Sequence, residues 1–91
     1  MNKRDLAYIV AYETGMSRAL AEAGVDSVFK AISAALQDGA KVRISGFGTF
    51  EVRDRKARVG RNPRTGETVP IPATRAPAFR AAQALKQAVN S

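Results

Sequence analysis

The spacing of apolar residues changes once along this chain, at Gly39. Over residues 21–36 apolar side chains recur at intervals of three and four, as on one face of a helix. Beyond Gly39 the interval falls to two, with Val42 and Ile44 between polar neighbours, which is typical of a half-buried strand. We therefore predict an α+β fold in which helices come first and a small antiparallel sheet follows.

Residues suited to helix ends divide the first part of the chain into two helices. Asn2 is a good N-cap, with Asp5 three residues on in a variant of the capping box, and Gly15 is placed to end this first helix. Ser17 caps a second, longer helix, which Gly39 ends as a left-handed residue. The two helices should form a hairpin.

Gly24 is expected inside the second helix, where glycine costs about 1 kcal/mol relative to alanine. Either a close packing contact or a local weak spot accounts for it, and the sequence does not decide between them. Near the other end of the chain, an alanine-rich run with Leu85 and Val89 four residues apart predicts a short closing helix from about residue 81 to 89.

The sheet is expected to begin as a hairpin. Its first strand covers 41–45, Gly46-Phe47-Gly48 forms the turn, and the second strand covers 49–52. Alternation along the second strand places Phe50 and Val52 toward the core.

In the next stretch, 53–64, apolar residues no longer alternate with polar ones, because Ala57 and Val59 are its only aliphatic side chains. It ends in Asn62-Pro63-Arg64-Thr65-Gly66, which is dense in turn-forming residues. A strand with so little to bury is expected to leave the body of the protein.

The return stretch, 68–73, is extended again but carries prolines that keep it out of a sheet interior. We predict a two-stranded ribbon with its tip near 61–66, mobile until a ligand orders it. At about 3.3 Å per residue, its limb from 53 to 60 would reach roughly 25 Å, enough to follow a DNA groove.

The net charge of +7 is concentrated in the second half of the chain. Between Lys41 and Arg80 ten basic residues stand against three acidic ones, whereas the first forty residues hold four basic and five acidic side chains. Eight of the ten are arginine, whose planar guanidinium suits phosphate. A solvated surface is the alternative, but so large a local excess favours a polyanionic partner, with nucleic acid as the leading candidate.

Length and composition bear on assembly and location. A chain of 91 residues without cysteine buries only a modest core and has no disulfide to support it, which favours a dimer. No apolar run approaches the roughly 20 residues that cross a bilayer, and the N-terminus lacks a signal-peptide core. We expect a cytoplasmic, unprocessed protein that does not engage membranes.

The composition argues against catalysis. The chain has no histidine and no cysteine, which removes the commonest general base, metal ligand and thiol nucleophile. The carboxylates of the helical part fall on helix faces or ends and form no acid–base pair: Asp5, Glu13, Glu22, Asp26 and Asp38. We predict that the protein is not an enzyme and has no catalytic residues, cofactor, metal or small-molecule substrate.

Several motifs resemble one known family over essentially the full length of the chain. They are Gly46-Phe47-Gly48-Thr49-Phe50, Gly60-Arg61-Asn62-Pro63 with Thr65-Gly66, Ile71-Pro72-Ala73, Pro77-Ala78-Phe79 and Leu85-Lys86. Together they resemble the HU and integration host factor family of histone-like, DNA-bending bacterial proteins. The stretch 71–79 and the short C-terminus look more like HU.

The resemblance implies an intertwined dimer with a helical base, a small antiparallel sheet and one protruding β-arm per subunit that enters the minor groove. It makes 1–91 a single HU-like domain. The dimerisation body is then 1–52 and 74–91, and the DNA-binding arm is 53–73.

Candidate DNA-binding residues gather on this arm, with a second set on the body. Those of the arm and its base are Arg53, Arg55, Arg58, Arg61, Asn62, Pro63, Arg64, Thr65, Gly66 and Arg75, and those of the body are Lys3, Gly46, Gly48, Arg80 and Lys86. The arginines are expected to contact phosphates and a narrow, electronegative groove, several of them from one side of the limb.

Pro63 and the phenylalanines each admit two interpretations. From the turn chemistry alone Pro63 is a turn residue, whereas the resemblance implies a rigid wedge that intercalates between base pairs and kinks the duplex. The phenylalanines could form a base-stacking set. We assign them instead, with their aliphatic neighbours, to a dimer core of Phe29, Ile32, Leu36, Ile44, Phe47, Phe50, Val52 and Phe79.

The predicted function is that of a histone-like protein of the bacterial nucleoid. It should bind double-stranded DNA with little sequence specificity, prefer bent, nicked or flexible sites, and bend DNA so that the chromosome is compacted. A homodimer is expected, with a heterodimer between paralogues as a further form. A sequence-specific integration host factor subunit and an RNA-binding protein are the alternatives.

Overall fold

A computed structural model describes residues 1–91 as two compact units, 1–38 and 39–91. The first contains two helices, and the second contains all the strands and a short C-terminal helix. Each unit is described here by itself. The α+β class expected from the change of apolar period is confirmed.

The first unit is a helical hairpin of α1 (Lys3–Thr14) and α2 (Arg18–Gln37). The capping box at the start of α1 is complete: the Asp5 amide donates to Asn2 Oδ1, and the Asn2 amide donates to Asp5 Oδ2, each over 2.9 Å. Gly15 ends α1 in the left-handed region at φ 76°, and the Ser17 hydroxyl caps α2. The predicted helix boundaries are therefore confirmed.

The core of this hairpin is small. Ala7 and Ala11 of α1 and Ala21 of α2 are its buried residues, with Val10 and Val25 packed against them. Larger apolar side chains of the same helices stay exposed, among them Leu20 at 58% and Val28 at 56%. The hairpin therefore presents far more apolar surface than it buries.

Gly24 lies within α2 and has open space where a side chain would begin, with no atom within 4 Å of an added Cβ. Of the two explanations left open by the sequence, the structure of this chain favours the local weak spot. An alanine there meets no obstacle within the chain.

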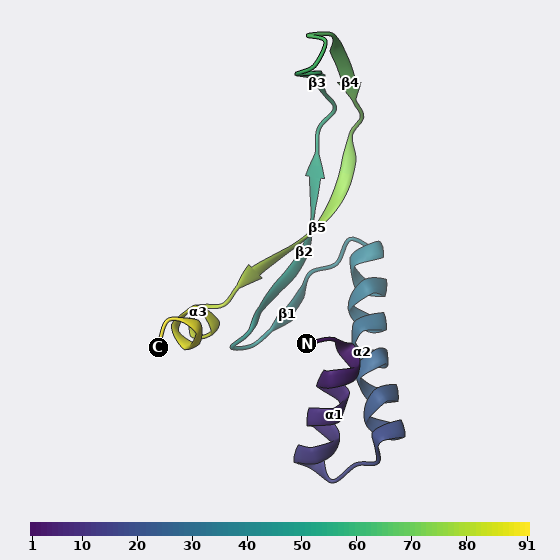
Figure 1. The fold of residues 1–91 in the computed structure, drawn as a ribbon, viewed down its shortest axis with the longest axis vertical. Helices are drawn as coiled ribbons and strands as arrows, with labels where there is room; N and C mark the ends of the chain where they lie inside the picture. The colour runs from purple at the N-terminus through teal and green to yellow at the C-terminus, as the bar shows by residue number, and fades with distance from the viewer. The chain divides into compact units, whose positions relative to one another are not determined.

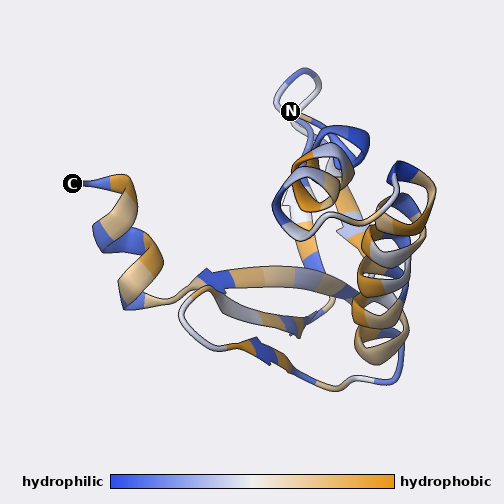
Figure 2. Cartoon of the chain, turned by 90° about the horizontal axis from the view of Figure 1, so that it is seen from below, coloured by the Kyte–Doolittle hydropathy of each residue, from blue (hydrophilic) through white to orange (hydrophobic).

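The second unit contains a three-stranded antiparallel sheet in the order β1-β2-β5. Its strands are β1 (Val42–Ile44), β2 (Gly48–Arg55) and β5 (Thr74–Ala81), followed by helix α3 (Gln83–Val89). Strands β3 (Arg58–Arg61) and β4 (Thr68–Ile71) pair only with each other and continue the long β2–β5 pair into a two-stranded ribbon, as Figure 1 shows. Figure 2 shows hydrophobic and hydrophilic residues following one another along the strands.

Three phenylalanine rings hold β5 against the rest of this sheet. Phe79 lies opposite Phe50 in the β2–β5 register, with 4.8 Å between ring centroids, and the Phe47 ring is 5.4 Å away. The same ring covers Gly48, where an added Cβ would lie 2.5 Å from Phe79 carbons and 2.7 Å from the Arg80 carbonyl oxygen. Glycine is required at this position because ring and backbone fill the space.

The structure corrects the expected strand boundaries. The turn covers residues 45–47, so Gly48 begins β2 and is not part of the turn. The return stretch does not stop at Ala73, because β5 runs for eight residues through Pro77. Proline is accommodated there since β5 is an edge strand and one side of it needs no donors. As a result α3 starts at Gln83, two residues later than expected.

No helix of the structure combines the length and apolar character needed to cross a bilayer.

The two glycines make a matched test of the packing. Gly48→Ala should lower the free energy of unfolding by about 1–3 kcal/mol through overpacking against Phe79 and the Arg80 carbonyl. Gly24→Ala should raise it by about 1 kcal/mol, because a helix interior favours alanine. Urea denaturation followed by circular dichroism measures both, and a destabilised Gly24→Ala protein would show that another chain packs closely there.

Candidate nucleic-acid interface

One face of the sheet carries a row of cations. In the register, Arg43 of β1 lies opposite Thr49 of β2, and Thr49 lies opposite Arg80 of β5, so these three side chains share one face. Arg53 and Arg55 follow on the same face of β2, since they are an even number of residues from Thr49. The phenylalanine pair occupies the opposite face.

The row borders a concavity of about 400 Å³ at the end of the sheet near α3. Its charged lining consists of Arg43, Arg80 and Lys86, without any carboxylate, and its polar lining includes Ser45, Thr49 and Gln83. Gly46 and Gly48 also line it. Four predicted body residues, Gly46, Gly48, Arg80 and Lys86, are thus brought together.

Sequence reasoning missed three polar members of this concavity and Arg43. The polar members are Ser45, Thr49 and Gln83. Arg43 and Thr49 had a usable signal, because both occupy the polar positions of alternating strands. Their pairing with Arg80 depends on β5, which the sequence did not predict as a strand.

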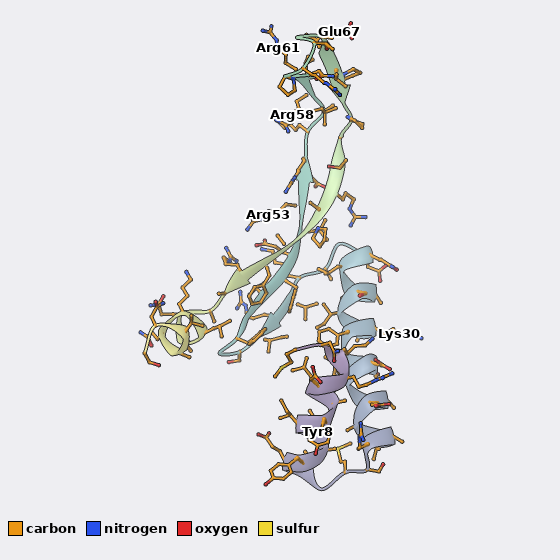
Figure 3. The ribbon with its side chains drawn as sticks, in the orientation of Figure 1. Tyr8, Lys30, Arg53, Arg58, Arg61 and Glu67 are labelled. Carbon is orange, nitrogen blue, oxygen red and sulfur yellow. The ribbon has the colours of Figure 1, made fainter.

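Arg53 has a carboxylate in reach. Its Nη2 lies 3.5 Å from Glu51 Oε1, a long contact on an exposed surface. Exposed pairs of this kind contribute little, so Arg53 is available to another anion. Figure 3 shows Arg53, Arg58 and Arg61 spaced along the structure from the sheet to the outer end of the ribbon.

The ribbon register separates the arginines that follow. Arg61 lies opposite Thr68 and Val59 opposite Pro70 on one face, while Arg58 lies opposite Ile71 on the other. Arg58 and Arg61 therefore point to opposite faces of β3–β4. The expectation that several limb arginines share a side holds for Arg53, Arg55 and Arg61, which the register keeps in phase, and does not hold for Arg58.

Strand pairing is interrupted between the sheet and the ribbon. Arg55 pairs with Thr74 and Arg58 with Ile71, while Lys56–Ala57 and Pro72–Ala73 between them are unpaired. The interruption takes two residues from each limb, so the same register continues on both sides of it.

Asn62 organises the tip of the ribbon. Its Oδ1 accepts from the Arg64 amide over 2.9 Å, and its carbonyl accepts from the Gly66 amide over 2.7 Å. Gly66 is in the left-handed region at φ 76°, and Thr65 Oγ1 accepts from the Glu67 amide. Asn62 was predicted as a DNA contact, and the structure gives its side chain a role in shaping the turn.

Pro63 is the first of the turn residues 63–65, and it is exposed. It follows Asn62 and precedes Arg64, so the hydrogen bonds around it involve its neighbours only. The tip therefore presents a rigid apolar ring that does not hold the turn together.

Two further residues that were predicted to contact DNA, Lys3 and Arg75, have neighbours within the chain. Lys3 Nζ forms an ion pair with Asp26 Oδ1 over 2.8 Å, on an exposed part of the helical hairpin. Arg75 lies opposite Asp54 in the β2–β5 register. Contact of Lys3 with a phosphate would compete with the Asp26 carboxylate.

The predicted dimer-core residues are incompletely covered in the single chain. Ile32, Leu36, Phe50 and Val52 are half-buried. Phe29, Ile44, Phe47 and Phe79 are 42%, 36%, 44% and 41% exposed. None of the eight is enclosed, so each offers surface to a further partner.

Comparison with known proteins shows the family to which the chain belongs. The family described as bacterial DNA-binding protein matches residues 1–90. DNA-binding protein HU-1 of Halalkalibacterium halodurans is 53% identical over 90 residues, which cover 99% of this chain and 100% of that protein. The chain belongs to the HU family of bacterial DNA-binding proteins. The resemblance seen in the motifs is confirmed.

Other HU proteins agree with this placement. The prophage-derived DNA-binding protein HU 2 of Bacillus subtilis is 56% identical over 91 residues, covering 100% of this chain and 99% of that protein. Among solved structures, Anabaena HU in a cocrystal with DNA superposes with a TM-score of 0.89 at 44% identity, covering 98% of this chain and 97% of that one. Both favour HU over integration host factor as the nearer branch.

Proposed function

We propose that this chain binds double-stranded DNA as a histone-like architectural protein, with little sequence preference, and bends it. The observation that carries the proposal is a cationic surface built from strand register: Arg43 and Arg80 across the sheet, Arg53 and Arg55 along β2, and Arg61 on the ribbon. A surface of this kind holds phosphates, which give affinity without sequence information.

Bending is assigned to the tip of the ribbon. Pro63 is exposed, compact and rigid, and the turn is held by Asn62 and Gly66 rather than by the proline. Inserted between base pairs it would unstack one step, and flexible, nicked or already bent sites would lower the cost. The proposed preference for such sites follows from that cost.

We infer further that the working form is a dimer of two copies of this chain. The buried hydrophobic residues of the whole chain are three alanines, although 45% of its residues are hydrophobic. Phe29, Phe47 and Phe79 keep about two-fifths of their surface exposed. A second copy that covers these surfaces supplies the missing core, and a paralogue of similar surface would form a heterodimer in the same way.

The proposed place of action is the bacterial nucleoid, and the proposed activity is binding without catalysis. Eleven cations against three carboxylates in residues 39–91 suit long polyanions rather than a small substrate. Two arms per dimer would hold curved DNA and so compact the chromosome.

The DNA-binding surface is tested by removing one charge at a time. Arg61→Gln should weaken binding and reduce the slope of log K against log salt by about 0.9, the value for one phosphate contact. Lys30→Gln, on α2 of the helical hairpin, removes the same charge from a residue outside the proposed surface and should leave the slope unchanged. Fluorescence anisotropy over a salt series measures both, and equal slopes for the two variants would contradict the proposed surface.

The wedge is tested by Pro63→Ala. The turn should persist, because the Asn62 and Gly66 hydrogen bonds do not involve the proline side chain. The DNA bend, measured by energy transfer between the ends of a labelled duplex, should fall markedly while the affinity falls less. A variant that bends DNA as far as the parent protein does would remove Pro63 from this role.

The dimer is tested without any substitution. Sedimentation equilibrium should give twice the chain mass, and the thermal midpoint should rise with protein concentration because unfolding separates the subunits. A monomeric mass together with a concentration-independent midpoint would exclude the dimer.

A further inference from the structure

One carboxylate lies among the cations of the sheet. Along β2, Thr49, Glu51 and Arg53 are alternate residues, and they share the face that carries Arg43 and Arg80. At about 3.3 Å per residue, Glu51 is roughly 7 Å along the strand from Thr49 on one side and from Arg53 on the other. The proposed DNA-binding surface therefore contains a negative group within its row of positive ones, which lowers its affinity for any polyanion.

The cations on the two sides of Glu51 are not equally opposed. At one end of the row, the concavity lined by Arg43, Arg80 and Lys86 has no carboxylate in its lining. At the other end the carboxylate touches a cation, with Glu51 Oε1 3.5 Å from Arg53 Nη2. Competition for a bound phosphate is therefore greatest at Arg53, where β2 leads from the sheet toward the ribbon.

The carboxylate is the fixed member of this ion pair. The Glu51 side chain is only 13% exposed, whereas the Arg53 side chain is 59% exposed. Ala78 lies opposite Glu51 in the β2–β5 register and has no side-chain donor, so the donor from the facing side chains is the Arg53 guanidinium. When a ligand arrives, the exposed arginine can turn toward it, while the covered carboxylate stays beside the arginine.

A phosphate at Arg53 would be opposed by Glu51 in two ways. It would replace the carboxylate as the partner of the guanidinium, and it would also be repelled by the carboxylate. A phosphate held by the same guanidinium lies within the Debye length of about 8 Å at physiological salt, so dissolved ions screen this repulsion only in part. The ion pair forms again as soon as the phosphate moves away.

We propose that Glu51 competes with DNA for Arg53 and thereby shortens the lifetime of the protein–DNA complex. This inference rests on the proposed function, of which it needs only a phosphate contact at Arg53. Binding through many phosphates is long-lived when no contact is opposed within the protein. A carboxylate beside one contact makes that contact the first to open, so release of the DNA begins at Arg53.

The competition is tested by Glu51→Gln, which keeps the size of the side chain and removes its charge. A fluorescent DNA duplex bound to the protein is mixed with an excess of the unlabelled duplex, and the rate of dissociation is followed at one salt concentration. The variant should release the duplex about fivefold more slowly than the parent protein, which is the upper end of the effect of an exposed ion pair.

Two further variants assign the effect to one arginine. In an Arg53→Gln protein the partner of the carboxylate is missing, so adding Glu51→Gln should leave the dissociation rate nearly unchanged. Arg55→Gln removes a charge from the same face, about 13 Å from Glu51 along the strand. In that protein Glu51→Gln should still slow dissociation about fivefold. A double-mutant cycle of this kind isolates the interaction between two side chains.

The outcomes separate this inference from the function on which it rests. An unchanged dissociation rate for Glu51→Gln, or equal slowing in the Arg53→Gln and Arg55→Gln proteins, would overturn the inference while DNA binding stands. Absence of salt-dependent DNA binding by the parent protein would overturn the proposed function itself. Melting curves check that each variant folds, and Glu51→Thr, which suits a strand, repeats the test if the glutamine variant melts early.

Discussion

The packing of Phe79 over Gly48 is the contact on which the rest of the second unit depends. With no side chain at Gly48, the ring lies against the β2 backbone and stacks beside Phe50 and Phe47. This contact fixes the register of β5 on β2. Since the same register continues into β3–β4, the contact at the base of the sheet decides which side chains share a face at the far end of the ribbon. Packing at one end of the strands thus sets the charge pattern at the other.

Local chemistry made the helices predictable. Asn2 with Asp5, Gly15 and Ser17 each act within one helical turn, and all take the expected roles. Strand β5 was not predicted because it is recognised by its pairing with β2, which is distant in the sequence. Taken alone, Pro77 and the small residues beside it resemble a loop. Arg58 and Arg61 are three residues apart, so alternation along one strand is enough to separate their faces, whereas the residues that lie opposite them follow only from the β3–β4 register. The turn at 62–66 was predicted, but Asn62 was assigned to the ligand, although its side chain bonds the Arg64 amide two residues on.

Charge is distributed between the units as the sequence predicted. The helical hairpin holds nearly balanced charges, and its Lys3 is engaged with Asp26. The strand-rich unit holds the excess, and two of its three carboxylates, Asp54 and Glu67, alternate away from the face that carries Arg53, Arg55 and Arg61. A small chain can arrange its charges in this way with little buried surface, because strand pairing orients the side chains of an extended ribbon without a buried core. The apolar surface left over is then available for assembly with a second copy.

The gap in pairing at Lys56–Ala57 and Pro72–Ala73 has a mechanical consequence. It divides the arm into two paired segments joined by four unpaired residues. The angle between the segments can therefore change without separating any pair of residues in β2–β5 or β3–β4. The arginines of β2 and those of the ribbon can then meet a curved phosphate backbone at different angles. Because the register is the same on both sides of these four residues, the arm can change direction there while each side chain stays on its own face of the arm. The arm thus consists of two paired segments whose side chains keep the same alternation when the angle between the segments changes. This arrangement suits a ligand whose curvature changes as it is bound.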